Sequence, residues 1–168
     1  MLIKSINKKK PILANNVYCA ENVTIIGDVI IEENTSIWLN VVIRGDVSSI
    51  KIGKSVNIQD GVVIHATYNK SKTIIGDNVS VGHNSILHGC NIFDNVLIGM
   101  GSIIMDNTII KSNSIIAAGS VVLENSIVEE GCLYAGTPAV KVKKLSTQQI
   151  KELIQDTAKK YVTYSNWF

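Results

Sequence analysis

The three histidines of this 168-residue chain, His65, His83 and His88, lie close together in the sequence. Neutral imidazole is a common protein ligand for zinc and similar ions. Confinement of every histidine to one short stretch therefore predicts a metal site, if the fold brings the side chains together. An isolated outward histidine is more often a plain surface or interface residue than a metal ligand. Whether the three histidines form a metal site therefore depends on where the secondary-structure elements place them.

Composition narrows the classes of function. The formal net charge is only +2, from 16 basic and 14 acidic residues, which argues against a nucleic-acid or membrane surface as a partner. No apolar run is long enough to span a bilayer, and the first residues lack the continuous apolar region of a signal peptide. The three cysteines (Cys19, Cys90 and Cys132) have no metal-binding spacing and are an odd number, which favours free thiols and a cytoplasmic location.

An aliphatic residue recurs every six positions over most of the chain. Neither a helical period of 3.6 nor the strand period of 2 explains this spacing, whereas a hexad of one short strand plus one turn does. A small or β-branched residue follows many of the hexad aliphatics by four positions. The hexad aliphatics are Ile25, Ile31, Ile37, Ile43, Ile52, Ile58, Ile64, Ile75, Val81, Leu87, Ile92, Ile98, Ile104, Ile110, Ile116, Val122 and Val128.

Three hexads form one triangular coil, and stacked coils pair through parallel sheets. The aliphatic residues are expected to point inward, with the small residues filling the corners. This repeat resembles that of the hexapeptide-repeat proteins, and the resemblance implies an all-β, left-handed parallel β-helix. We expect the β-helix domain over residues 1–140, because Pro138 and its neighbours break the period.

Residues 141–168 are predicted to be a basic linker followed by a C-terminal α-helix. Ser146 and Gln149 have the spacing of a capping box at the start of this helix. Such a helix can pack along the outside of the coil or against a neighbouring subunit. The apolar face of the helix is expected to comprise Ile150, Leu153, Ile154, Ala158, Tyr161 and Val162.

The hexad register arranges the histidines in two outward columns. Every third hexad lies on the same side, so Arg44, His65 and His88, which directly follow stacked aliphatics, should form one column. Asp60 and His83 should form a second column at another corner. If three such prisms packed side by side, the first column of one would face the second column of its neighbour. Three imidazoles would then converge on one ion, and a fourth position would stay open, as in catalytic zinc sites. Asp60 and Arg44 could instead be simple interface ion pairs.

Several longer strings of residues carry a more specific pattern than the repeat. Together they resemble the γ-class carbonic anhydrase-like family, which differs from ordinary hexapeptide acyltransferases in having this trio of histidines. The strings are Ile37-Trp38, Val42-Ile43-Arg44-Gly45-Asp46, Ile52-Gly53, Asn57-Ile58-Gln59-Asp60-Gly61, Ile64-His65, Val81-Gly82-His83 and Leu87-His88-Gly89-Cys90.

This resemblance implies a homotrimer with Zn²⁺, or Fe²⁺ or Co²⁺, at each subunit interface. His65 and His88 would come from one chain and His83 from the next. It also implies an ion pair between Arg44 and Asp60 across the interface, and contacts of Asn57 and Gln59 with metal-bound solvent or substrate, supported by Asp46. Tyr161 on the terminal helix is the remaining candidate near the metal. The implied reaction is reversible hydration of carbon dioxide to bicarbonate by a metal-bound hydroxide.

The sequence departs from the active members of that family at the positions that export protons. The segment after the first histidine, residues 66–73, contains no carboxylate, and Val47 follows Asp46 where those enzymes have glutamate. Weak hydration is therefore expected. The alternatives are an acyl-coenzyme A thioesterase that uses the same metal site, a hexapeptide-repeat acyltransferase, and a catalytically inactive trimeric scaffold.

Overall fold

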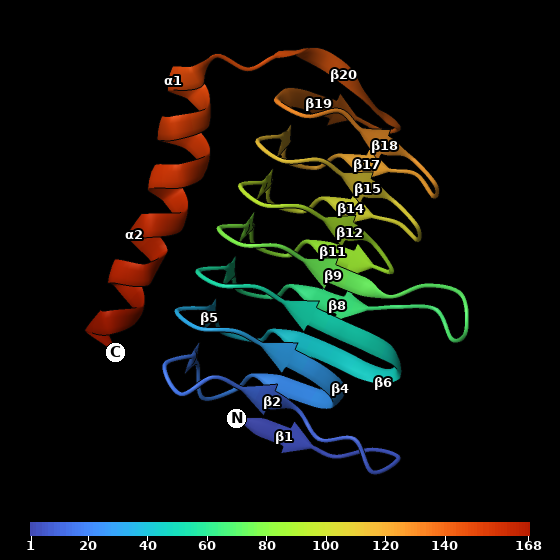
Figure 1. The fold of residues 1–168 in the computed structure, drawn as a ribbon, viewed down its shortest axis with the longest axis vertical. Coiled ribbons are helices and arrows are strands. Elements are labelled where there is room, and N and C mark those ends of the chain that lie inside the picture. Colours follow the sequence, from blue (N-terminus) through green and yellow to red (C-terminus); the bar gives the residue numbers. More distant parts are fainter.

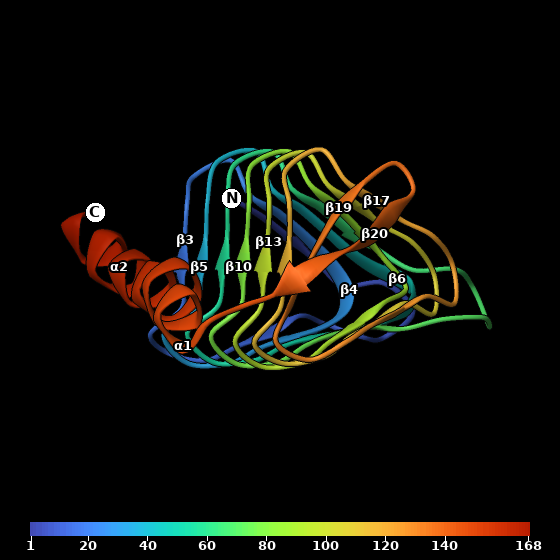
Figure 2. The same ribbon diagram turned by 90° about the horizontal axis from the view of Figure 1, so that it is seen from above.

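A computed structural model describes all residues from Met1 to Phe168. Its strands wind into a left-handed, three-sided parallel β-helix of about seven turns, with one helical segment beside it (Figures 1 and 2). The predicted fold class is therefore confirmed. The first side consists of β1 (Leu2–Lys4), β4 (Thr24–Ile31), β6 (Val42–Ile52), β8 (Val63–His65), β11 (Ile86–His88), β14 (Ile103–Ile104) and β17 (Val121–Val122).

The long strands β4 and β6 bend around a corner and so contribute to the second side as well. The other strands of the second side are β2 (Ile12–Leu13), β9 (Thr73–Ile75), β12 (Asn91–Ile92), β15 (Ile109–Ile110) and β18 (Ile127–Val128). The third side consists of β3 (Tyr18–Cys19), β5 (Ser36–Ile37), β7 (Asn57–Ile58), β10 (Ser80–Val81), β13 (Leu97–Ile98), β16 (Ile115–Ile116), β19 (Cys132–Gly136) and β20 (Ala139–Lys144).

The interior of the prism is filled by the hexad aliphatics. Each of them, from Ile25 to Val128, is at most 2% exposed, which confirms the predicted inward column on every side. The small residues at the corners are also buried: Ser85, Ser102 and Thr108 expose no surface. Since these side chains account for nearly the whole core, the six-residue step of the sequence is also the step of the packing.

Asparagine and glycine turn the chain at the corners. Many asparagines, including Asn84, Asn95 and Asn107, have a positive φ between 55° and 58°. This left-handed conformation costs most residues about 1–2 kcal/mol, whereas asparagine and glycine adopt it more readily. Short strands followed by such turns keep the three sides distinct.

Strand pairing confirms the predicted register, including its irregularity. Ile43 pairs with Ile64, and Ile64 pairs with Leu87, although the chain bulges outward between them. Ile75 pairs with Ile92 and Ile92 with Ile110, so the first of these two steps is one residue shorter than the second. The insertion after Ile43 lies within the bent strand β6, whereas the insertion after Ile64 and the deletion before Ile92 lie between strands, and all three leave the stacked columns intact.

The C-terminal segment differs in part from the prediction. Residues 141–144, expected as a linker, belong to strand β20, which pairs antiparallel with β19 and closes the last coil. Ser146 and Gln149 do form a capping box. The helical segment then runs through α1 (Thr147–Gln149), the π-helical η1 (Ile150–Gln155), α2 (Asp156–Tyr164) and the 3₁₀ turn η2 (Ser165–Trp167).

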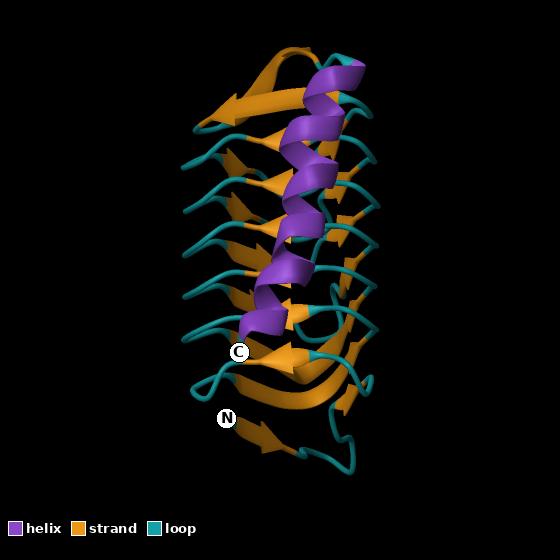
Figure 3. Cartoon of the chain, turned by 90° about the vertical axis from the view of Figure 1, so that its left-hand side faces the viewer, coloured by secondary structure: helices purple, strands orange, loops and turns teal.

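This helical segment runs back along the third side of its own prism, antiparallel to the direction of coiling (Figure 3). Ile154 and Ala158 are buried against the sheet, whereas Leu153, predicted on the same apolar face, is 46% exposed in the single chain. The wider π-helical turn of η1 changes the angular spacing that an α-helical period assumes. No helix in the structure combines the length and the apolar character that crossing a bilayer requires.

Candidate metal centre

Two of the histidines lie side by side on the first side of the prism. His65 ends β8 and His88 ends β11, and the two residues are direct partners in the parallel pairing of these strands. The preceding residues, Ile64 and Leu87, point into the core, so both imidazoles point outward. The predicted histidine column is therefore present.

Each ring of this pair directs one nitrogen at the other ring and one at a carboxylate. Nδ1 of His65 lies 3.2 Å from Nε2 of His88. Nε2 of His65 lies 3.1 Å from Oδ1 of Asp46, and Nδ1 of His88 lies 3.0 Å from Oδ1 of Asp106. We call these four residues the two-histidine cluster.

The two carboxylates of the cluster are held in their charged form. Burial alone would raise the pKa of Asp106, but hydrogen bonds from Ser71, Thr67 and His88 outweigh it and lower the pKa below the ordinary value. Asp46 behaves in the same way: burial acts to raise its pKa, and hydrogen bonds from Arg44 and His65 lower it. Burial lowers the pKa of His65 and so favours the neutral imidazole. The hydrogen bond to Asp46 acts in the opposite direction but does not outweigh burial.

A cation fits between the facing nitrogens. A carboxylate can only accept hydrogen bonds, so the ring nitrogens that face Asp46 and Asp106 carry the protons of those two bonds. The facing nitrogens of His65 and His88 are then the ones with lone pairs for a cation, and Nη2 of Arg44 lies 3.5 Å from Nδ1 of His65. Two zinc–nitrogen bonds of about 2.0–2.1 Å at a tetrahedral angle place the nitrogens about 3.3 Å apart. The observed 3.2 Å agrees with this spacing.

His83 belongs to a different corner of the prism. It follows β10, and its Nδ1 lies 2.8 Å from Oδ2 of Asp60, which follows the adjacent strand β7. This pair confirms the predicted second column, and we call it the His83 pair. Its carboxylate occupies Nδ1 and leaves Nε2 for a ligand. Within one chain, no three His, Cys, Asp or Glu side chains are grouped so as to hold a metal.

The other predicted site residues lie near either the two-histidine cluster or the strands that carry the His83 pair. Arg44 is near the two-histidine cluster, with Nη1 donating to Asp46 at 2.6 Å and Nη2 3.5 Å from Nδ1 of His65. Asn57 and Gln59 are buried, and the Gln59 amide donates to Oδ1 of Asn57 at 2.9 Å. In the single chain, therefore, Arg44 pairs with Asp46, while Asp60 pairs with His83.

Tyr161 lies in an aromatic cluster where the end of the helical segment meets the first coils. Its ring packs edge-on against Trp38, with the ring centroids 5.7 Å apart. Burial, and then the nearby charge of Asp60, raise the pKa of its hydroxyl. The helical segment thus brings Tyr161 to the corner of the prism that carries the His83 pair.

Asp106 is a member of the cluster that the sequence analysis did not identify. It lies two residues after the hexad aliphatic Ile104, which is the hexad position that Asp60 and His83 occupy after Ile58 and Val81. That shared position is a signal that could have singled it out. Its carboxylate is only 5% exposed and still accepts three side-chain hydrogen bonds.

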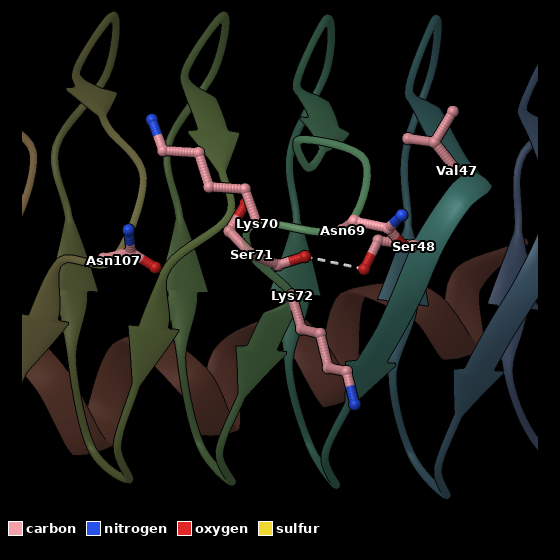
Figure 4. A pocket seen from close by; sticks show the side chains of 7 residues that line it. All are labelled: Val47, Ser48, Asn69, Lys70, Ser71, Lys72 and Asn107. Atoms are coloured by element: carbon pink, nitrogen blue, oxygen red, sulfur yellow. Dashed lines mark hydrogen bonds between the residues drawn. The ribbon is translucent and has the colours of Figure 1, made fainter.

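A polar hollow of about 450 Å³ lies beside the loop of residues 66–72. Figure 4 shows Ser71 at its centre, where its carbonyl accepts a hydrogen bond of 2.6 Å from Ser48 Oγ. The amino groups of Lys70 and Lys72 point away from each other in this view, so they do not form a joint anion site. None of the histidines lines this hollow.

The lowered pKa of Asp106 predicts a pH-dependent contribution to folding. A carboxyl whose pKa is lower when folded stabilises the protein above its unfolded pKa of about 3.9, and loses this effect as the pH falls through the folded value. We expect the metal-free wild type to be more stable than Asp106→Asn at pH 5, and the gap to shrink towards pH 3. Urea unfolding of both proteins at pH 5, 4 and 3 measures this gap. A constant gap would contradict the prediction.

Comparison with known proteins places this geometry in a family. The model "Bacterial transferase hexapeptide (six repeats)" matches residues 89–124. A carbonic anhydrase of Geobacillus kaustophilus is 52% identical over 86% of this chain and 79% of its own length. A "Probable carbonic anhydrase" of Methanocaldococcus jannaschii is 49% identical over 91% of this chain and 95% of its own length. The chain spans only 57% of the length of the mitochondrial γ carbonic anhydrase 2 of Arabidopsis thaliana, at 35% identity.

A solved structure agrees with the fold over almost the whole chain. The putative acetyltransferase of Bacillus cereus is 39% identical, has a TM-score of 0.96, and covers 99% of this chain and 95% of its own. The sequence relatives cover most of both chains at about half identity, and the chain therefore belongs to the γ-class carbonic anhydrase-like family of hexapeptide-repeat proteins.

Proposed function

We propose that this protein catalyses the reversible hydration of carbon dioxide with a zinc ion held between two copies of the chain. The observation that carries the proposal is the 3.2 Å separation of Nδ1 of His65 and Nε2 of His88, whose other nitrogens are held by Asp46 and Asp106. Fe²⁺ and Co²⁺ suit the same nitrogen ligands. The relatives named carbonic anhydrase support the reaction.

The third ligand in this proposal is His83 of a second copy, and three copies related by a threefold axis would then form a homotrimer with three equivalent sites. The outer surface next to the two-histidine cluster supports an interface there. Val63, Ile86 and Ile103 form a stacked apolar column on the same strands and are each between 37% and 39% exposed. Packing against another copy would remove this column from water.

Held by these residues, a zinc ion would supply a bound water with a pKa of about 7, and so a nucleophile at neutral pH. Asp46, Asp106 and Asp60 fix the orientation and the tautomer of the three imidazoles. The amides of Asn57 and Gln59, already joined to each other, would orient carbon dioxide or solvent beside His83. Because loop 66–72 lacks a carboxylate, proton export depends on buffer or solvent, and turnover is slow.

Acyl transfer is the second candidate, favoured by the match to the Bacillus cereus structure named as a putative acetyltransferase.

We propose the cytoplasm as the location of this protein. All three cysteines are free thiols, which suits a reducing compartment.

Metal content and a hydration assay test the proposed function. Protein purified without oxygen should hold about one metal ion per chain. It should hydrate carbon dioxide when loaded with zinc, cobalt or iron, and the rate should rise with imidazole buffer as an external proton acceptor. Bound metal without hydration, together with cleavage of acyl-coenzyme A, would replace the proposal with a thioesterase. Protein that binds no metal but transfers acetyl groups would establish the transferase, and bound metal with neither activity would leave a scaffold.

A further inference from the structure

We propose that Asp106 is a positioning residue that joins loop 66–72 to the metal ligand His88, so that loop order and metal affinity depend on each other. The inference rests on the proposed metal site. It concerns a residue whose side chain would not itself contact the metal, because His88 lies between them in this arrangement.

Both oxygens of the Asp106 carboxylate are used. Oδ1 accepts from Nδ1 of His88 at 3.0 Å and from Oγ of Ser71 at 2.6 Å, while Oδ2 accepts from Oγ1 of Thr67 at 2.6 Å. Thr67 and Ser71 lie near the two ends of the loop. One buried carboxylate thus closes the loop and orients the imidazole of His88. A shift of the Asp106 carboxylate would therefore disturb the loop and the imidazole together.

Neighbouring bonds strengthen the same junction. The amide of Thr67 donates to Oγ of Ser71 at 3.0 Å, which closes the base of the loop. Thr73, which is fully buried, donates to the carbonyl of His65 at 2.6 Å and accepts from the amide of Gly89 at 2.9 Å. The chain leaving the loop is therefore bonded to the backbone of both histidine strands.

Gly89 provides the space in which the junction forms. Its φ is +59°, and a Cβ at this position would overlap the Asp106 carboxylate and the Ser71 hydroxyl. The residue directly after His88 therefore has no side chain, and the loop serine can reach the same oxygen that holds the imidazole.

Coupling of this kind is reciprocal: if loop order raises metal affinity, then metal binding must raise loop order by the same factor. The chain offers a matched comparison, because Asp46 holds His65 as Asp106 holds His88. Asp46 is bonded to Arg44 rather than to the loop. Loss of either carboxylate should weaken metal binding, but only loss of Asp106 should also release the loop.

The test uses the full-length protein and zinc alone. Zinc affinity comes from competition with a chelator, and the order of loop 66–72 comes from hydrogen exchange with and without zinc. We expect Asp106→Asn and Asp46→Asn each to lose about 10–100-fold in zinc affinity, as is usual for carboxylates behind a histidine ligand. Zinc should slow exchange in the loop of the wild type and of Asp46→Asn, but much less in Asp106→Asn.

Ser71→Ala tests the link from the loop side and leaves Asp106 in place. We expect it to lose several-fold in zinc affinity although Ser71 touches no metal ligand. Wild-type zinc affinity in Ser71→Ala, or unchanged loop exchange in Asp106→Asn, would overturn the inference. If the wild type binds no zinc, the proposed function fails separately. The loop should then still exchange faster in metal-free Asp106→Asn than in the wild type, and equal rates would overturn the inference as well.

Discussion

Two inactive variants should restore zinc sites when they assemble together. His65→Ala and His83→Ala should each lose nearly all bound zinc, because each removes one of three ligands from every site. In a trimer that mixes the two variants, a site is intact where one copy supplies His65 and His88 and the next supplies His83. Every trimer that contains both variants has one intact site among its three, so about one third of the sites in mixed trimers should hold zinc. Metal analysis of co-expressed trimers, purified through a different tag on each variant, measures this fraction.

The separate variants provide the control for this experiment. His83→Ala purified alone should be as poor in zinc as His65→Ala, even though His83 lies at a different corner from the two-histidine cluster. Retention of zinc by His83→Ala alone would mean that two histidines of one chain suffice. Mixed trimers without any zinc would exclude a site shared between copies.

Ile75→Ala should destabilise the protein by about 2–5 kcal/mol, the usual cost of emptying a buried isoleucine site. Ile75 is 1% exposed and points into the prism, where hexad aliphatics of adjacent coils stack above and below it. A cavity there interrupts the packing of three consecutive coils. Urea unfolding at a fixed protein concentration measures the loss, and keeps any contribution from assembly constant.

Ile74→Ala is the matched control, since it changes the same residue type at the neighbouring position of β9. Ile74 points outward and is 42% exposed, so its loss should cost less than about 1 kcal/mol. Similar losses for the two variants would contradict the inward and outward assignment of this strand.

Much of the candidate site followed from spacing alone. A β-strand directs successive side chains to opposite faces, so an inward hexad aliphatic fixes its neighbours outward. Parallel pairing of Ile64 with Leu87 then stacks His65 on His88, and pairing of Ile58 with Val81 brings Asp60 to His83. The separation of His83 from the other two histidines follows from the same register.

The helical segment was less predictable. The capping box at Ser146 and Gln149 marked its beginning, but the sequence did not indicate the π-helical turn η1 or the exposure of Leu153. Residues 141–144 became a strand because the last coil leaves an open edge on β19 with which they can pair. The local conformational preference of these residues predicts neither the position of Leu153 nor the strand at residues 141–144.

The three-sided coil, its buried aliphatic columns and the two outward histidine columns could all be predicted from the hexads, because a six-residue period repeats the same local geometry at each step. The bonds that join Asp106 to His88 and to Thr67 and Ser71 of the loop became visible only in the folded chain. Those residues are far apart along the chain, and the loop that carries two of them follows no period. Their meeting depends on the space left by Gly89 and on the path of the loop across the coils.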